Sequence, residues 1–305
     1  MVRHWKKPGL LLLLVLATAG SFAADKGRAT LIREEYLYAS PGANSQKLSQ
    51  VNRGTALTVV ETSTADGQPW LKISMAADQA AVSKEVTGWM PGKLIVNAST
   101  PNGDQIIFGQ AVDSERQAEE RGGRKGAADD ARRLYSRVAE LFPQSELAAE
   151  AMWRAADIRW QLAKTAGATG PVEKYLQEVI DRYPQSKPAD LAAFDLMEGK
   201  MCPEWRGLPD CPEKESALYE QYAREHPQSP KAAEALFDAA WRQAALADIY
   251  RLSEDRDKSE AARKKGIALA QQVENQYSQG DWKPRALDLA YKLQQKIVLY
   301  GPPED

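Results

Sequence analysis

This 305-residue sequence contains few of the residues on which most enzymes depend. It has two histidines, only one of them beyond residue 25, and two cysteines. A single histidine supports neither a histidine-rich zinc site nor a Ser-His-Asp triad, and no glycine-rich phosphate-binding loop occurs. Carboxylates are plentiful, but nothing singles out a pair placed for glycoside hydrolysis. We therefore expect no catalytic residue, no metal ligand and no cofactor, and we interpret the chain as not an enzyme.

Long apolar runs are also scarce. The longest, residues 10–19, is shorter than the roughly 20 residues that span a bilayer. Three basic residues precede this run, and a small-x-small cleavage site ends at Ala23. This order predicts that residues 1–23 are a secretory signal peptide. We expect a secreted, periplasmic protein with no membrane span.

Neither sign of charge is in large excess, since 40 basic and 42 acidic residues give a formal net charge of −2. Removal of residues 1–23 takes away three basic and no acidic side chains, which leaves 37 against 42 and a net charge near −5. Nucleic-acid binding depends on clustered lysines and arginines. The charge therefore argues against a nucleic-acid partner.

The two cysteines, Cys202 and Cys211, lie close together in a segment rich in proline and glycine. In an exported protein such an even pair predicts a disulfide. Two thiols alone do not form a zinc site, and a catalytic dithiol has the tighter Cys-x-x-Cys spacing. A ring of this size would stabilise the fold by about 2.5–3 kcal/mol in the chain-entropy model.

A four-residue phrase, an aromatic residue or His followed by Pro-Gln-Ser, occurs three times, at residues 142–145, 183–186 and 226–229. The prolines are 41 and 43 residues apart, a period typical of a helical repeat array. Apolar residues stand four and seven positions before each copy, which is one face of a helix. Proline then ends that helix, and serine can cap the next one. We expect stacked helix pairs whose surface holds another molecule.

Two further features belong to this array. A degenerate fourth copy at residues 277–280 lacks the proline, and a capping helix is expected after it, from Arg285 to Leu299. His226 occupies the position of Phe142 and Tyr183 in the sister copies. We therefore interpret His226 as a side chain that packs at a helix end.

Residues 28–98 have a different pattern, with short β-type runs separated by turns that contain Gly, Pro or Asn. Alternation of apolar and polar residues from Trp70 to Met75 predicts a half-buried strand. About five such runs in so short a module favour a small closed barrel over an open sheet with exposed edges. Residues 99–103 are then a linker, and residues 104–300 form the helices. The predicted fold class is α+β and multidomain, a β-barrel followed by an all-α solenoid.

The order of motifs in this module resembles the bacterial SH3-like (SH3b) domain. The matching segments are residues 38–42, 53–60, 70–73 and 88–90, with the Gly-Trp pair at Gly88 and Trp89. The resemblance implies an SH3-like barrel that binds cell-wall peptides or protein segments. Candidate residues for a ligand groove are the aromatic Tyr36, Tyr38, Trp70 and Trp89. The alternative is that these rings form the core or rim of the barrel.

The helical region, residues 104–300, resembles tetratricopeptide repeats, in particular the long-period kind of bacterial envelope proteins whose second helix ends in aromatic-Pro-x-Ser. The resemblance implies a tetratricopeptide-like solenoid that binds an envelope protein or peptide. Two hypotheses follow. The first is a non-enzymatic envelope scaffold that binds its partner through the repeats, with the barrel as a second contact. The alternative is a peptidoglycan-binding protein that uses the barrel, with the repeats as a spacer or assembly surface.

Overall fold

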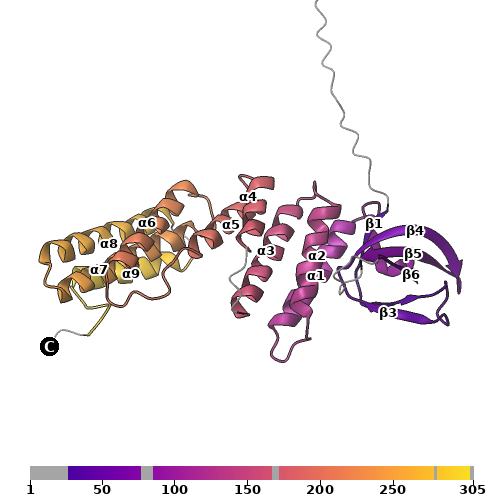
Figure 1. The fold of residues 1–305 in the computed structure, drawn as a ribbon. Helices are drawn as coiled ribbons and strands as arrows, with labels where there is room; N and C mark the ends of the chain where they lie inside the picture. The colour runs from indigo at the N-terminus through magenta and orange to yellow at the C-terminus, as the bar shows by residue number, and fades with distance from the viewer. Residues whose placement is uncertain (1–26, 77–84, 167–171, 278–279, 303–305) are drawn as a thin grey trace, which may run out of the picture.

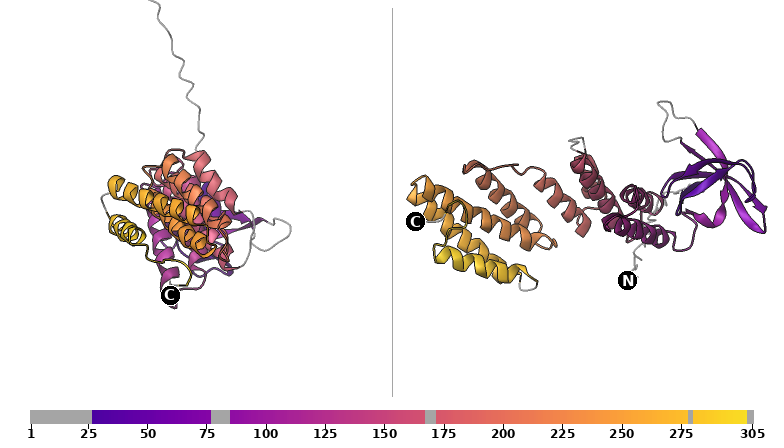
Figure 2. Two further views of the ribbon diagram at one scale, coloured as in Figure 1. Left: turned by 90° about the vertical axis from the view of Figure 1, so that its left-hand side faces the viewer. Right: turned by 90° about the horizontal axis from the view of Figure 1, so that it is seen from below.

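The computed structural model describes residues 27–76, 85–166, 172–277 and 280–302. The predicted signal peptide, residues 1–23, lies outside this part of the chain. A β-sheet module forms one end of the molecule, and the helices extend from it in a long row (Figure 1). Seen along this row, the helices overlap in a narrow stack (Figure 2, left). No described helix combines the length and the apolar character needed to cross a membrane.

The sheet module contains seven described strands, all paired antiparallel with their neighbours in the order β3-β2-β6-β5-β4-β1-β7. The strands are β1 (Arg28–Leu31), β2 (Glu35–Tyr38), β3 (Lys47–Val51), β4 (Ala56–Ala65), β5 (Gln68–Ala76), β6 (Glu85–Pro91) and β7 (Ile95–Asn97). A 3-10 turn, Gly92–Leu94, joins the last two.

The expected closed barrel is not formed by this pairing, because β3 and β7 remain as the two edges among the described strands. The β7 edge is covered instead by helices, since Val96 packs into the first helical core. Along β3, the other edge, four of the five residues are exposed. The sheet has its own apolar core of fully buried side chains, which includes Leu31, Leu37, Ile73 and Met90.

Nine helices follow in the described residues. They are α1 (Gly103–Glu119), α2 (Ala127–Leu141), α3 (Ala148–Thr165), α4 (Glu173–Arg182), α5 (Lys187–Glu198), α6 (Asp210–Glu225), α7 (Ala232–Leu252), α8 (Arg256–Gln276) and α9 (Trp282–Gln294). The first residue of each repeated motif is the C-cap of an even-numbered helix, namely Phe142, Tyr183, His226 and Tyr277. The predicted helical repeat is therefore confirmed, and its period corresponds to one helix pair.

The tyrosines of the motif also join one repeat to the previous one. The Tyr183 hydroxyl donates to the Pro143 carbonyl oxygen at 3.3 Å. In the same way, the Tyr277 hydroxyl donates to the Pro227 carbonyl oxygen at 3.3 Å. The proline both ends its helix and leaves its carbonyl available to the next repeat.

The prediction that the motif serine caps the next helix is correct in one copy only. Ser186 is the N-cap of α5 and accepts a hydrogen bond from the Ala189 N–H at 3.2 Å. Ser145 and Ser229 accept instead from a backbone N–H two residues later, in the turn before the helix. The final described helix, α9, also differs from expectation: it spans Trp282–Gln294, whereas a helix from Arg285 to Leu299 was predicted.

The sheet module is packed on the first helix pair. Val96 and Ile32 from the sheet join a core that contains Ile107 of α1 and Leu134 of α2. Arg133 of α2 donates from Nε to the Arg53 carbonyl oxygen at 3.0 Å. The strands end at Asn97 and α1 begins at Gly103, close to the predicted linker. Independent folding of the two parts remains a prediction.

Candidate protein-binding surfaces

Three of the four aromatic rings proposed for a ligand groove lie inside the sheet module. Tyr38, Trp70 and Trp89 form one buried cluster, in which Trp70 is 1% exposed. The rings of Tyr38 and Trp70 meet edge to face, with centroids 5.3 Å apart. Only Tyr36 is exposed, and the Lys47 ammonium lies 4.2 Å from its ring centroid. Packing therefore accounts for three of these rings.

Cys202 and Cys211 form the predicted disulfide, with their Cα atoms 6.0 Å apart. The bond joins Cys202, in the connection after α5, to Cys211 in the first turn of α6. Glu215 of α6 is buried beneath this loop and accepts hydrogen bonds from the Cys202 N–H at 3.0 Å and from Trp205 Nε1 at 3.1 Å. Arg242 of α7 donates to the same carboxylate. The loop is thus fixed to two helices, which indicates a structural role.

A row of carboxylates follows the odd-numbered helices α1, α3, α5 and α7. Burial raises the pKa of Asp195 on α5 to about 6, and the negative charges of Asp157 on α3 and Glu198 add to this effect. Burial likewise raises the pKa of Asp238 on α7 to about 6, with Glu198 again contributing. Burial also raises the pKa of Asp157, helped by Glu115 on α1. The carboxylates therefore lie close enough to influence one another, and we name this row the acidic face; Arg154 and Arg242 pair with two of its members, Glu115 and Asp238.

Sequence reasoning missed this acidic face, although a signal for it exists. Asp195 and Asp238 both stand nine residues after the serine of their motif, next to the apolar positions Phe194 and Phe237. The same position in the first repeat is Arg154, which is paired with Glu115 at 2.9 Å. Comparing charged positions between the second and third repeats, as well as apolar ones, would have predicted the part of the face that Asp195 and Asp238 form.

A groove with the opposite charge crosses α2, α3 and α4, with a cavity of about 200 Å³. Its lining includes five arginines, namely Arg132, Arg133, Arg137, Arg159 and Arg182, and only two carboxylates, Glu140 and Glu178. Its apolar lining comes mainly from α3, with Met152, Ala155 and Ala156. We name this feature the arginine groove. It is the counterpart of the acidic face on the same helical array.

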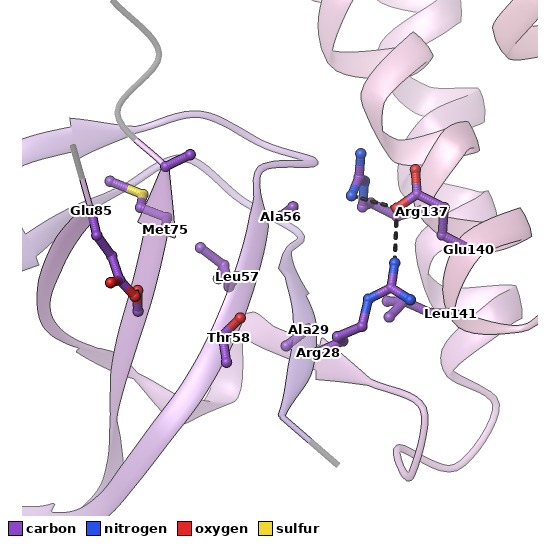
Figure 3. Close-up of a pocket in the computed structure, with 12 residues that line it drawn as sticks. Arg28, Ala29, Ala56, Leu57, Thr58, Met75, Glu85, Arg137, Glu140 and Leu141 are labelled. Carbon is purple, nitrogen blue, oxygen red and sulfur yellow. Dashed lines mark hydrogen bonds and ion pairs between the residues drawn. The ribbon is translucent and has the colours of Figure 1, made fainter. Parts of the chain in front are cut away.

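A second cavity, of about 360 Å³, lies where the sheet meets α2 (Figure 3). Arg28 of β1 and Arg137 of α2 both approach Glu140, which joins the two modules across the cavity. The lining is mixed in charge, since Glu85 of β6 faces it as well. Arg137 and Glu140 also line the arginine groove, so the two cavities share this part of α2.

The one histidine of the described residues is held in a packing role. His226 Nδ1 lies 2.8 Å from Asp190 Oδ1, and its ring stacks on Tyr222 with centroids 4.8 Å apart. Across the described ranges, no three His, Cys, Asp or Glu side chains gather in a way that could hold a metal ion.

No protein-family model and no curated protein matches this sequence. Among solved structures, the chain is similar to a de novo designed helical repeat protein, with 18% identity over 64% of this chain and 94% of that chain and a TM-score of 0.25. It is also similar to a thermophilic TPR protein of Thermus thermophilus, with 19% identity over 63% of this chain and 90% of that chain and a TM-score of 0.24. Neither similarity says anything about function, and the helical repeat rests on the helix pairs described above.

Proposed function

We propose that this chain is an exported, non-enzymatic scaffold of the bacterial cell envelope. It binds a protein or peptide partner through the helical repeats, and the SH3-like sheet module provides a second contact. The observation that carries this proposal is the pair of charged features on one helical array, the row of carboxylates on the odd-numbered helices and the five arginines that line the arginine groove. Complementary charge on an extended surface gives a protein partner its orientation and its specificity.

Export is supported by two independent features. The order of charged, apolar and small residues in residues 1–23 is that of a signal peptide. The disulfide between Cys202 and Cys211 is of the kind that persists in an oxidising compartment such as the periplasm. Intact-mass measurement after cell fractionation should find a mature chain that begins at or within a residue of Ala24. An uncleaved chain in the cytosol would contradict the proposal.

The binding function is tested by presenting the immobilised mature chain in parallel with envelope proteins and with purified peptidoglycan. We expect retention of a defined protein that is released at high salt, because the contacts are between charged surfaces. Retention of peptidoglycan alone would contradict the scaffold function.

The alternative function is peptidoglycan binding through the sheet module. It is favoured by the motif order that resembles the SH3b domain and by the exposed Tyr36 beside Lys47 on the outer surface of the sheet. Under this alternative, Tyr36→Ala would weaken retention on peptidoglycan, and substitutions in the helical array would not.

A further inference from the structure

Four of the five arginines in the arginine groove already pair with carboxylates of the chain, among them Arg132 with Asp129 and Arg133 with Asp130. Glu140 is shared between Arg137 and Arg28, and Glu178 is paired with Arg182 at 3.3 Å. In the described part of the chain, Arg159 has no carboxylate within ion-pair distance. An anionic group from another molecule would therefore find in Arg159 a guanidinium that no carboxylate of the described residues pairs with.

Arg159 lies against an aromatic ring. Its guanidinium carbon lies 3.7 Å from the ring centroid of Tyr175, which is the geometry of a cation–π contact. A guanidinium stacked by its face on a ring keeps its edge for two parallel hydrogen bonds to a carboxylate. Burial, together with the positive charge of Arg132, lowers the pKa of Arg159. A bound carboxylate would offset this repulsion.

The shape of the groove distinguishes between kinds of anion. Its arginines come from three different helices, and Met152, Ala155 and Ala156 provide apolar surface among them. A small inorganic anion would use only one or two of these donors and none of the apolar surface. An extended peptide with acidic and apolar side chains would use both. The net charge near −5 of the mature chain repels an acidic segment overall, so its attraction has to come from the local positive charge of this groove.

We infer that the arginine groove is the docking site for an acidic, partly apolar segment of a protein partner. Arg159 and Arg182 would bind its carboxylates, and Met152 would contact its apolar side chains. This inference rests on the proposed function and specifies the partner's chemistry and the helices that bind it.

The test begins with a display library of short random peptides selected on the immobilised mature chain. We expect the selected peptides to be rich in Asp and Glu together with apolar residues. A selected peptide, made with a fluorescent label, should bind in an anisotropy titration, and its version with Gln in place of every Glu and Asp should not. Binding should also weaken steeply as salt is raised.

Variants then locate the binding site. The double variant R159Q/R182Q should bind the selected peptide at least about tenfold more weakly, because two charge-assisted hydrogen-bond partners are lost. The matched control R116Q/R224Q removes two exposed arginines on α1 and α6 and should bind like the wild type. The charge-reversed variant R159E/R182E should instead bind a version of the peptide that carries Lys in place of Glu. Circular dichroism of each variant checks that the helices are intact.

Any of the following results would overturn the inference. The selected peptides could be free of acidic residues, or R159Q/R182Q could bind the acidic peptide like the control. The groove variant could also lose retention on purified peptidoglycan while the library gives no acidic peptide, which would assign the groove to the cell wall. If the R159Q/R182Q variant still captures a protein partner, the docking site is refuted but the proposed function is not. Failure to bind any peptide or protein would refute the proposed function as well.

Discussion

Replacement of Glu215 by glutamine tests how the disulfide loop is held on the helices. Glu215 is 2% exposed, and its Oε1 accepts from the Cys202 N–H at 3.0 Å and from Trp205 Nε1 at 3.1 Å. Its Oε2 accepts from Arg242 Nε at 3.2 Å. Glutamine has a single oxygen, and its amide N–H2 would face one of these donors. The E215Q variant therefore leaves buried N–H groups without an acceptor.

The magnitude follows from the burial of these partners. Removal of one partner from a buried ion pair costs about 3–5 kcal/mol, and each unsatisfied buried donor adds to the cost. Arg242 retains a second carboxylate, since its Nη1 lies 3.3 Å from Asp238 Oδ1, and this reduces the loss. We expect E215Q to lower the free energy of unfolding by about 2–4 kcal/mol.

Urea unfolding followed by tryptophan fluorescence and by circular dichroism measures this change. The matched control is E225Q, an exposed glutamate on the same helix, which should stay within about 0.5 kcal/mol of the wild type. If E215Q unfolds with the same midpoint as E225Q, the Glu215 carboxylate does not hold the loop and the reasoning is refuted.

Three other perturbations test separate parts of the fold. Because the folded pKa of Asp195 is raised to about 6, its protonated form is favoured in the native state, and its contribution to stability is lost as pH rises from about 4 to 6. D195N should therefore be more stable than the wild type above about pH 6, by roughly 1 kcal/mol after allowance for partial exposure. In urea titrations near pH 4 the two proteins should be equally stable. A stability difference that stays constant with pH would contradict this reasoning. The double variant C202S/C211S should lose about 2.5–3 kcal/mol in oxidising buffer and match the reduced wild type when dithiothreitol is present. G54A should lower the thermal midpoint more than G67A. Both glycines have φ near +70°, but only at Gly54 would the added Cβ lie 2.6 Å from the Arg133 Cβ. Equal midpoints would show that α2 does not pack closely against this turn.

The helical repeat was predictable because its signals are local. A proline after an aromatic residue ends a helix wherever it occurs, and the apolar positions before Phe142, Tyr183 and His226 mark the buried face of that helix. The disulfide was predictable for a similar reason, since Cys202 and Cys211 are close in sequence.

Features that depend on contacts between distant residues were not predictable in the same way. Closure of the sheet depends on whether its two edge strands meet, and Val96 is instead turned into the core of the first helices. The buried positions of Trp70 and Trp89 depend on pairing of β2 with β6, which joins Tyr38 to Trp89. The hydrogen bond from the Tyr183 hydroxyl to Pro143 also requires the stacking of two repeats.

The arginine groove illustrates the same limit at a candidate site. Arg132, Arg159 and Arg182 come from three helices, and the sequence alone shows them as ordinary charged residues on separate helix surfaces. Only the packing of α2, α3 and α4 brings them into one groove. Aligned helix pairs make such grooves, so charged residues of neighbouring repeats should be examined together.

Photo-crosslinking in cells that produce the full chain tests the central claim most directly. A photoreactive amino acid would replace one exposed apolar residue at a time, Ile106 of α1 or Leu162 of α3 on the helical array, and Leu48 of β3 or Val60 of β4 on the sheet. A scaffold that binds through its repeats should give a defined protein adduct from the helical positions, and the adduct should disappear with R159Q/R182Q. Adducts confined to the sheet positions and released by a peptidoglycan hydrolase would contradict the account.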